Sequence, residues 1–309
     1  MGKNEHTEKE PFVFINGAIV KKSKARISPF DRGLIYGDGA FEAIRYYNDR
    51  LFRFHDHMER LRKSLSFLKI QLPRDEDFIE NTILNLLKRS ELSRGYVRII
   101  VTRGVSATGI DPRNATVPSL MILVERREPL FLSKESVTAK ISSTIQPPIG
   151  VLDPRMKTLN YLNKVIAKMD AIESGYDVPI LLNSLGEVTE CGTENIFIAR
   201  NGELVTPAID SGLLPGITRD TVLRIASDLG IKATERVLYE DDLYDADEVF
   251  ATGTAIGIIP IREVSGKQVA RFESFEMTMK LQSIYHNSIS GNGIEFSKPD
   301  KEKTNASTQ

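Results

Sequence analysis

The sequence predicts a mixed α/β (α+β) protein with two domains. Asn-Gly turns join short apolar runs into β-hairpins in both halves of the chain, at Asn16-Gly17 and at Asn201-Gly202. Other segments in each half carry apolar residues at helical spacing. A length of 309 residues fits two domains or one large α/β unit. The charged segment 125–129 ends in proline and separates the halves, so we expect two domains.

The first half predicts a hairpin, two amphipathic helices and two further strands. In order along the chain, the predicted elements are a hairpin at 12–20, helices containing 58–68 and 78–87, and strands at 96–102 and 119–124. We therefore expect a small N-terminal α/β domain at residues 11–124. The following residues, 125–137, are the expected interdomain linker.

The second half predicts a larger domain at residues 138–287. Its first helix has Leu162, Val165, Ile166, Met169 and Ile172 on one face and ends near Gly175. A second helix is predicted after 213–218, with Val222, Ile225 and Leu229 inward and Gly230 at its end. The other predicted elements are a strand at 178–183, a hairpin at 195–206, and strands at 248–252 and 258–264. From about residue 288 the sequence is polar and aperiodic, which predicts a disordered tail at 288–309.

Composition excludes several classes of function. The 41 basic and 42 acidic side chains give a formal charge of -1, without the basic excess of a nucleic-acid binder. Residues 1–10 are charged, and no stretch approaches the ~18 apolar residues of a membrane span, so we expect a cytoplasmic protein. Cys191 is the single cysteine, which excludes an intramolecular disulfide and a CxxC metal site.

The four histidines do not predict a metal site, because the sequence has no HExxH motif. His55 and His57 lie near a predicted helix start, where capping or surface exposure is the usual role.

Three separate segments are candidates to bind one phosphate-like dianion. The chain has neither a P-loop nor a complete GxGxxG motif. Gly216-Ile217-Thr218 begins a predicted helix and offers backbone N–H groups and a hydroxyl, although an ordinary helix cap is the alternative. Gly253-Thr254-Ala255 repeats this chemistry, and Arg60 at another helix start could add bidentate contacts.

Two further residues are candidates for catalysis. Lys157 lies just before the helix that contains Leu162, where an ordinary surface lysine is the alternative. Glu190 lies between a turn and a strand and could equally be a solvated carboxylate. No spacing rule connects the two residues, so the pattern alone leaves both roles open.

Taken together, seven segments in this order resemble the fold-type IV pyridoxal-phosphate enzymes. The segments are residues 36–45, 57–61, 96–98, 157–162, 190–197, 214–219 and 253–255. The family contains branched-chain aminotransferase, which the chain resembles most, D-amino-acid aminotransferase and aminodeoxychorismate lyase. The resemblance covers about residues 11–285. It implies a two-domain fold and a homodimer or higher homo-oligomer, with each site built across the interface.

The resemblance assigns cofactor roles for pyridoxal 5'-phosphate. Lys157 matches the lysine that binds the cofactor covalently and moves a proton, which requires an unprotonated amine. Glu190 matches the carboxylate that keeps the pyridine nitrogen protonated, so that the ring withdraws electrons. Tyr161 matches the tyrosine beside the phenolic oxygen. The other implied cofactor contacts are Arg60, Ile217, Thr218 and Thr254 around the phosphate, with Leu214 and Gly216 near the ring.

The resemblance also implies the substrates, an amino acid and a 2-oxo acid such as 2-oxoglutarate. Tyr96 and Arg98 match a Tyr-x-Arg pattern around the substrate carboxylate. The other implied substrate contacts are the backbone at Thr254 and Ala255, the apolar pocket residues Tyr36 and Phe41, and Ile110, which matches a position supplied by the neighbouring subunit.

The chain departs from the branched-chain pattern at several positions. Ala43 stands where a glycine is usual, and Ile256-Gly257 where Ala-Glu is usual, but neither change removes a catalytic group. The linker lacks the aromatic residues that line the hydrophobic pocket in several members. Arg126 or Arg127 could instead neutralise a second substrate carboxylate, or both could be solvated linker charges.

Branched-chain L-amino acids are the expected donors. A D-amino-acid aminotransferase and an aminodeoxychorismate lyase are alternatives within the fold. A protein that binds the cofactor without turnover is an alternative of another class.

Overall fold

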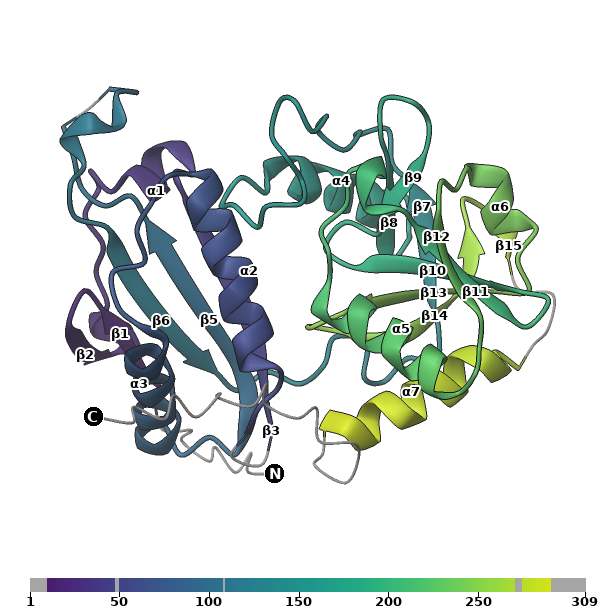
Figure 1. The fold of residues 1–309 in the computed structure, drawn as a ribbon, viewed down its shortest axis with the longest axis horizontal. Helices are drawn as coiled ribbons and strands as arrows, with labels where there is room; N and C mark the ends of the chain where they lie inside the picture. The colour runs from purple at the N-terminus through teal and green to yellow at the C-terminus, as the bar shows by residue number, and fades with distance from the viewer. Residues whose placement is uncertain (1–9, 48–49, 108, 270–273, 290–309) are drawn as a thin grey trace, which may run out of the picture.

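The chain folds around two β-sheets that lie beside each other (Figure 1). The structure is a computed structural model and describes residues 10–47, 50–107, 109–269 and 274–289. One sheet has six strands from the first part of the chain, and the other has nine strands from the rest. Each sheet has its own hydrophobic core.

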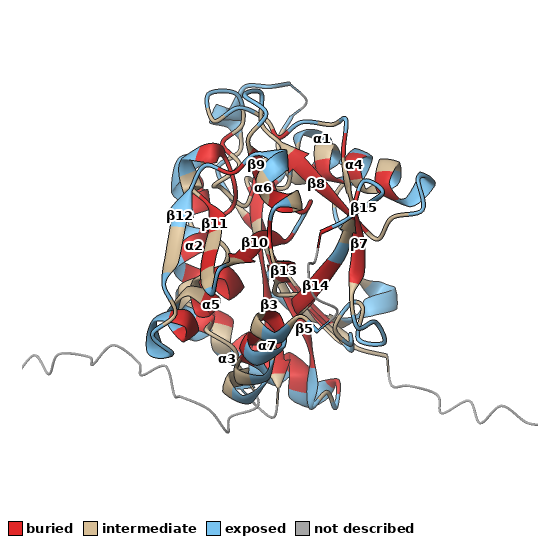
Figure 2. Ribbon diagram, turned by 90° about the vertical axis from the view of Figure 1, so that its right-hand side faces the viewer, coloured by how far each residue is buried: buried red, intermediate tan, exposed pale blue. Residues whose placement is uncertain are grey.

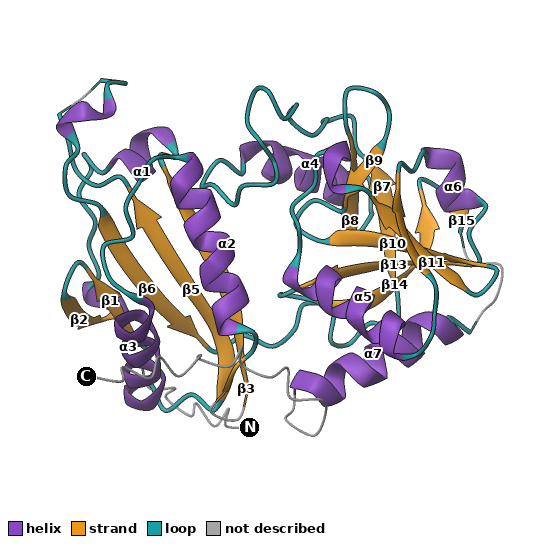
Figure 3. Cartoon of the chain, in the orientation of Figure 1, coloured by secondary structure: helices purple, strands orange, loops and turns teal. Residues whose placement is uncertain are grey.

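The six-stranded sheet is antiparallel, with strand order β2-β1-β6-β5-β3-β4. Its strands are β1 (Phe12–Ile15), β2 (Ala18–Lys21), β3 (Gly39–Tyr47), β4 (Arg50–Leu51), β5 (Arg94–Thr102) and β6 (Ser119–Glu125). Helices α2 (Phe54–Phe67) and α3 (Glu76–Arg89) cover one face (Figure 3). The short helix α1 (Arg32–Tyr36) precedes β3.

The nine-stranded sheet has the order β12-β11-β10-β13-β14-β7-β8-β9, with β15 paired to β14. Its strands are β7 (Val137–Ile141), β8 (Val178–Leu182), β9 (Val188–Glu190), β10 (Asn195–Arg200), β11 (Glu203–Pro207), β12 (Ala233–Arg236), β13 (Glu248–Gly253), β14 (Gly257–Val264) and β15 (Lys267–Gln268). The parallel pair β7 and β8 is joined through α4 (Leu162–Glu173), and the parallel pair β11 and β12 through α5 (Ile217–Asp228). Parallel neighbours require such crossovers.

Most residues of the strands in the larger sheet are buried, as Figure 2 shows for β8, β10 and β13. Helices α5 and α7 (Glu276–Ile289) pack together against this sheet, and α6 (Glu240–Tyr244) precedes β13. The 3₁₀ turns are Lys22–Lys24, Pro112–Asn114 and Ile209–Ser211.

Both predicted Asn-Gly hairpins are confirmed. Asn16 and Gly17 have φ of 47° and 96°, and Asn201 and Gly202 have φ of 52° and 78°. Both central residues of each turn therefore adopt the left-handed region that a two-residue hairpin turn requires, which asparagine and glycine tolerate best. Gly230 ends its helix as predicted, with φ of 67°.

The predicted apolar stripe of α4 lies on the surface of the chain and does not face the core. Its five apolar side chains, at positions 162, 165, 166, 169 and 172, are 47% to 70% exposed. The buried face of α4 instead carries Lys164, Ala167 and Ala171. Small residues let the helix pack closely on the sheet, and the apolar stripe is left on the surface.

Two other apolar side chains of the predicted helices are also partly exposed, and one of them, Leu229, was expected to point inward. Phe78 of α3 is 36% exposed and packs edge-on against Phe14, and Leu229 at the end of α5 is 38% exposed. Both lie at helix ends, where the buried face is narrowest.

The predicted linker lies between the two sheets. β6 ends at Glu125 and β7 begins at Val137. The exact domain bounds stay a prediction. Ser288 and Ile289 of the expected tail are the last residues of α7, and the remainder of the tail, 290–309, lies outside the described residues. Within the described ranges, every helix is too short or too polar to cross a membrane.

Candidate active site

A cavity of about 340 Å³ lies between the two sheets and brings together residues from distant parts of the chain. Its walls come from β3 and β5, the linker, the segment before α4, the start of α5 and the β13–β14 turn. The predicted site residues that line it are Phe41, Arg60, Tyr96, Arg98, Lys157, Tyr161, Glu190, Leu214, Gly216, Ile217, Thr218, Thr254 and Ala255.

Strand alternation explains which side chains of the small sheet reach the cavity. Successive side chains of a strand point to opposite faces. On β5, Val97 and Ile99 enter the core beneath the helices, whereas Tyr96 and Arg98 face the cavity. Phe41 does the same on β3. This wall of the cavity is therefore the sheet face that α2 and α3 leave uncovered.

Lys157 is held by its backbone and faces Tyr161. Its N–H donates to Ser64 Oγ (2.9 Å), and its carbonyl accepts from the N–H of Phe41 (3.1 Å). Lys157 Nζ lies 3.3 Å from Tyr161 Oη and 4.8 Å from the centroid of the Phe41 ring. Burial alone would raise the pKa of Tyr161, but the charges of Lys157 and Lys164 hold this pKa below its ordinary value.

Glu190 is 1% exposed and is held by groups from three segments. Gln146 Nε2 and Lys164 Nζ donate to Oε1 (2.7 and 2.6 Å), and the N–H of Leu214 donates to Oε2 (3.2 Å). Burial would lower the pKa of Lys164, but Glu190 and Tyr161 raise it above its ordinary value. This side of the cavity therefore holds a buried ion pair rather than a solvated carboxylate.

Arg60 forms a buried, bidentate ion pair with Glu42. Arg60 Nε donates to Oε1 (2.7 Å) and Nη2 to Oε2 (2.9 Å), while Nη1 donates to the carbonyl of Pro215 (2.9 Å). Burial would raise the pKa of Glu42, but Arg60 and His57 hold it far below its ordinary value. The guanidinium is thus fixed in orientation where it lines the cavity.

His57 is buried beneath this ion pair, contrary to the expected capping or surface role. Its Nδ1 lies 2.7 Å from Glu42 Oε2, and burial lowers its pKa. A neutral His57 can therefore donate its Nδ1–H to Glu42. His55 is exposed, as expected, and contacts Glu76 (3.3 Å).

The start of α5 provides backbone N–H donors at the wall of the cavity. Gly216 is the N-cap residue, and no side chain among the described residues caps the helix. A Cβ atom at Gly216 would lie 1.9 Å from Asn195 Oδ1, so glycine permits this close packing. Free N–H groups and the positive end of the helix dipole favour an anion. Thr218 lines the cavity beside them.

Arg45 fixes the backbone at the other end of the cavity. Its guanidinium donates to the carbonyls of Thr254 (2.9 Å), Ala255 (2.6 Å) and Arg127 (2.5 Å). Within the described part of the chain, the N–H groups of Thr254 and Ala255 have no hydrogen-bond acceptor. Because both carbonyls face Arg45, the turn presents hydrogen-bond donors, and not acceptors, to the cavity.

Tyr36 and Ile110 do not line this cavity. Ile110 is 86% exposed, and Tyr36 Oη accepts a hydrogen bond from the N–H of the adjacent Gly109 (3.0 Å). The two residues therefore share one surface, outside the cavity of their own chain.

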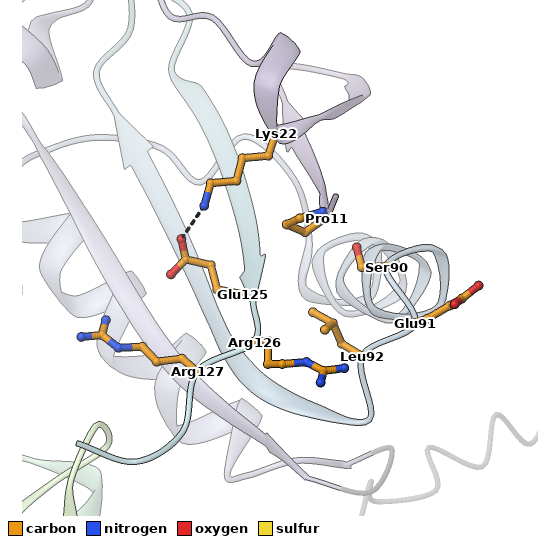
Figure 4. Close-up of a pocket in the computed structure, with 8 residues that line it drawn as sticks. All are labelled: Pro11, Lys22, Ser90, Glu91, Leu92, Glu125, Arg126 and Arg127. Carbon is orange, nitrogen blue, oxygen red and sulfur yellow. Dashed lines mark ion pairs between the residues drawn. The ribbon is translucent and has the colours of Figure 1, made fainter. Parts of the chain in front are cut away.

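The two linker arginines differ in position. Both line a second pocket of about 390 Å³ beside α3, shown in Figure 4. Arg127 also lines the cavity between the sheets, and Arg126 does not.

Comparison with known proteins identifies the family. Residues 39–264 match the model of the family described as amino-transferase class IV. The chain is 39% identical over 273 residues to a putative branched-chain-amino-acid aminotransferase of Methanocaldococcus jannaschii, covering 88% of this chain and 94% of that one. The chain belongs to the class IV aminotransferases, which are fold-type IV enzymes that use pyridoxal phosphate.

Solved structures agree with this assignment. A branched-chain amino acid aminotransferase of Escherichia coli superposes with a TM-score of 0.89 at 28% identity, covering 93% of this chain and 97% of that one. A branched-chain amino acid aminotransferase of Thermobaculum terrenum, solved in its PLP-form, superposes with a TM-score of 0.82 at 28% identity, covering 92% of this chain and 95% of that one.

The donor set of the cavity fits pyridoxal phosphate. The phosphate requires anion donors, which the start of α5 and Arg60 provide. The aldehyde requires an amine, and Lys157 is the lysine on the cavity wall. Thr252 also lines the cavity, and its hydroxyl is buried without a hydrogen-bond partner among the described residues.

Sequence reasoning missed three charged residues that organise the site: Glu42, Arg45 and Lys164. The first two lie in the 36–45 segment, where charges within a β-rich run were a signal that they are buried and paired. Lys164 gave no such signal, because a lysine on an amphipathic helix is normally solvated.

Proposed function

We propose that this enzyme transfers the amino group of a branched-chain L-amino acid to 2-oxoglutarate, with Lys157 as its catalytic residue. The observation that carries the proposal is that Lys157, Glu190 and the start of α5 meet in one cavity. Relatives that are named branched-chain-amino-acid aminotransferases and cover nearly the whole chain support the choice of substrate.

Bound pyridoxal phosphate supplies an aldehyde that bonds to amines and a protonated ring that withdraws electrons from the substrate Cα. Arg60, Thr218, Thr254 and the N–H of Ile217 would hold the phosphate. Glu190 would face the ring nitrogen, and its ion pair with Lys164 fixes the position of the carboxylate. Leu214 and Gly216 would pack near the ring.

Lys157 Nζ would hold and move the proton of the substrate Cα. Its hydrogen bond to Tyr161 keeps the amine at a fixed place on the wall. A lowered pKa makes Tyr161 a better proton donor, because the phenol gives up its proton more readily.

The substrate would lie against the face of β3 and β5. We propose that its carboxylate contacts Tyr96, Arg98 and the free N–H groups at Thr254 and Ala255. Phe41 offers an apolar surface to the side chain, which suits a branched hydrocarbon.

We also propose a homodimer. The exposed apolar stripe of α4 is a surface that a second copy would cover. Helix α1, which ends at Tyr36, and helix α4 lie on the same side of the molecule in Figures 1 and 2. We propose that Tyr36 and Ile110 complete the apolar pocket of the partner subunit.

The domain assignment stays part of the proposal. We take residues 11–124 as the small domain, 125–137 as the linker and 138–287 as the large domain. The two separate hydrophobic cores support this division. We also propose the cytoplasm as the site of action, in keeping with a single, buried cysteine.

The test is a half-reaction screen of the holoenzyme with L- and D-amino acids. We expect L-leucine, L-isoleucine and L-valine to convert the bound cofactor to its amine form, and 2-oxoglutarate to reverse the conversion, both followed by absorbance. Reaction with D-alanine or D-glutamate alone would replace the proposal by a D-amino-acid aminotransferase. Release of pyruvate from aminodeoxychorismate without an amino acceptor would indicate the lyase.

A variant identifies the catalytic residue. Lys157→Ala should lose covalent attachment of the cofactor and lower turnover on the order of 10³-fold or more. Lys63→Ala, in which the replaced lysine is exposed on α2, is the matched control and should retain both. A Lys157→Ala protein that still binds the cofactor covalently and turns over would contradict the assignment.

A further inference from the structure

Arg98 and Arg127 are two guanidinium groups on the cavity wall that have no acidic partner among the described residues. Both guanidinium groups lie against the ring of Tyr96, with Cζ at 5.9 Å (Arg98) and 5.7 Å (Arg127) from the ring centroid. Arg60 differs, because Glu42 neutralises it. The substrate end of the cavity therefore holds two positive charges that remain available.

The carboxyl groups of the cavity do not compensate these charges. Glu190 is already paired with Lys164. Burial raises the pKa of Glu194, which favours its neutral form. An anion with more than one carboxylate would therefore find two unpaired guanidinium groups in one cavity.

The backbone of Arg127 is fixed beside the turn that we propose for the substrate carboxylate. Its carbonyl accepts from the buried Arg45, which also holds the carbonyls of Thr254 and Ala255. The N–H of Leu130 donates to the carbonyl of Ala255 (2.9 Å), which ties the linker to the same turn. The backbone from which the Arg127 side chain extends is therefore held in a fixed position relative to the turn at Thr254 and Ala255.

Arg127 and its neighbour Arg126 point in different directions. In Figure 4, Arg126 extends toward Leu92, whereas Arg127 extends to the opposite side. Of the eight residues drawn, Arg127 alone also lines the cavity between the sheets. The two adjacent arginines therefore form a matched pair, one beside the site and one outside it.

We propose that Arg127 is a specificity-determining residue that binds the distal carboxylate of dicarboxylic substrates, the class to which 2-oxoglutarate and glutamate belong. This inference rests on the proposed function, in which the near carboxylate contacts the Thr254–Ala255 turn. A guanidinium can bind a carboxylate through two parallel hydrogen bonds. A branched hydrocarbon side chain leaves Arg127 in contact with solvent, because Arg127 is exposed. One cavity thereby accepts both kinds of substrate.

The test compares two unreactive acids of similar shape on the holoenzyme by titration calorimetry. Glutarate carries a distal carboxylate, and 4-methylvaleric acid carries a branched hydrocarbon there. Arg127→Gln should raise the Kd of glutarate about tenfold, as the loss of one charged hydrogen-bonding partner predicts. The Kd of 4-methylvaleric acid should change less than twofold, and Arg127→Lys should restore part of the glutarate affinity.

Arg126→Gln is the control and should change neither Kd by more than twofold. Equal weakening of both acids in Arg127→Gln, or an unchanged Kd of glutarate, would overturn the proposal. In the half-reaction, Arg127→Gln should slow L-glutamate about tenfold more than it slows L-leucine. If wild-type protein does not react with L-leucine, the proposed donor is wrong, while the glutarate comparison still decides the role of Arg127.

Discussion

Glu42 on β3 holds Arg60 on α2 through two hydrogen bonds of 2.7 and 2.9 Å, and both side chains are buried. The pair joins the small sheet to the helix that covers it. It also leaves the guanidinium in one orientation at the edge of the cavity, where an anion would be bound. The same carboxylate therefore serves both stability and the proposed phosphate site.

Glu42→Gln should lower the free energy of unfolding by about 3 kcal/mol, because it leaves the buried Arg60 without its counter-charge. It should also weaken cofactor binding, because Arg60 loses its fixed orientation. Denaturant unfolding and titration of the apoprotein with pyridoxal phosphate measure the two effects. Glu59→Gln, which removes an exposed pair with Lys63, should change neither. Equal stability of the two variants would contradict the role of Glu42.

Acid should destabilise the protein through the same residue. The pKa of Glu42 is lowered in the folded state, so the ion pair contributes its full stability above the ordinary glutamate pKa of about 4.3. That contribution should decline as the pH falls below this value toward the folded-state pKa. The free energy of unfolding, measured from pH 7 to pH 3, should fall less steeply in Glu42→Gln than in wild type. Parallel curves would show that other carboxylates dominate.

Lys164→Met should destabilise the holoenzyme by about 3 kcal/mol, because Glu190 remains buried without its cationic partner. Turnover should also fall, since Glu190 is the carboxylate proposed to face the ring nitrogen. Lys168→Met is the control on the same helix, where the lysine donates to the carbonyl of Asp177. A smaller loss in Lys164→Met than in Lys168→Met would refute the importance of the buried pair.

Gly216→Ala should weaken cofactor binding and cost about 1–3 kcal/mol of stability, because the new Cβ would overlap Asn195 Oδ1. Relief of this overlap must shift the start of α5, which carries the N–H groups proposed to bind phosphate. Gly150→Ala is the control, since a Cβ there meets nothing within 4 Å. Cofactor affinity equal to wild type would show that α5 does not bind the phosphate.

Ile166→Glu should convert the proposed homodimer to a monomer, because it places a charge within the apolar stripe of α4. Light scattering at fixed protein concentration measures the mass. Leu185→Glu changes an exposed leucine outside α4 and should leave the dimer intact. A wild-type protein that is monomeric would exclude this interface.

Several elements could be predicted because local chemistry decides them. A two-residue hairpin turn requires left-handed backbone, which the Asn-Gly pairs tolerate with little dependence on their surroundings. Strand alternation on β5 likewise predicts that Tyr96 and Arg98 share a face. The ordered motifs around Lys157 and Glu190 were enough to indicate the family and its cofactor. The first motif carries the amine proposed to bind the cofactor, and the second carries the carboxylate proposed to face its ring nitrogen.

The apolar stripe of α4 could not be assigned to the core or to a surface from the sequence. Periodicity shows that a helix has an apolar face, but the same pattern suits a core and an interface between chains. Here the small residues Ala167 and Ala171 face the sheet, and Lys164 reaches Glu190 from the same side.

By itself, the sequence determined the turns, the strand and helix segments and the chemical groups of the site, since these depend on residues a few positions apart. Only the tertiary structure decided which charges meet. Glu42 with Arg60, Lys164 with Glu190, and Arg127 rather than Arg126 at the cavity are results of packing between distant segments. Burial makes such pairs necessary, because a charge removed from water must find a partner wherever the fold places one.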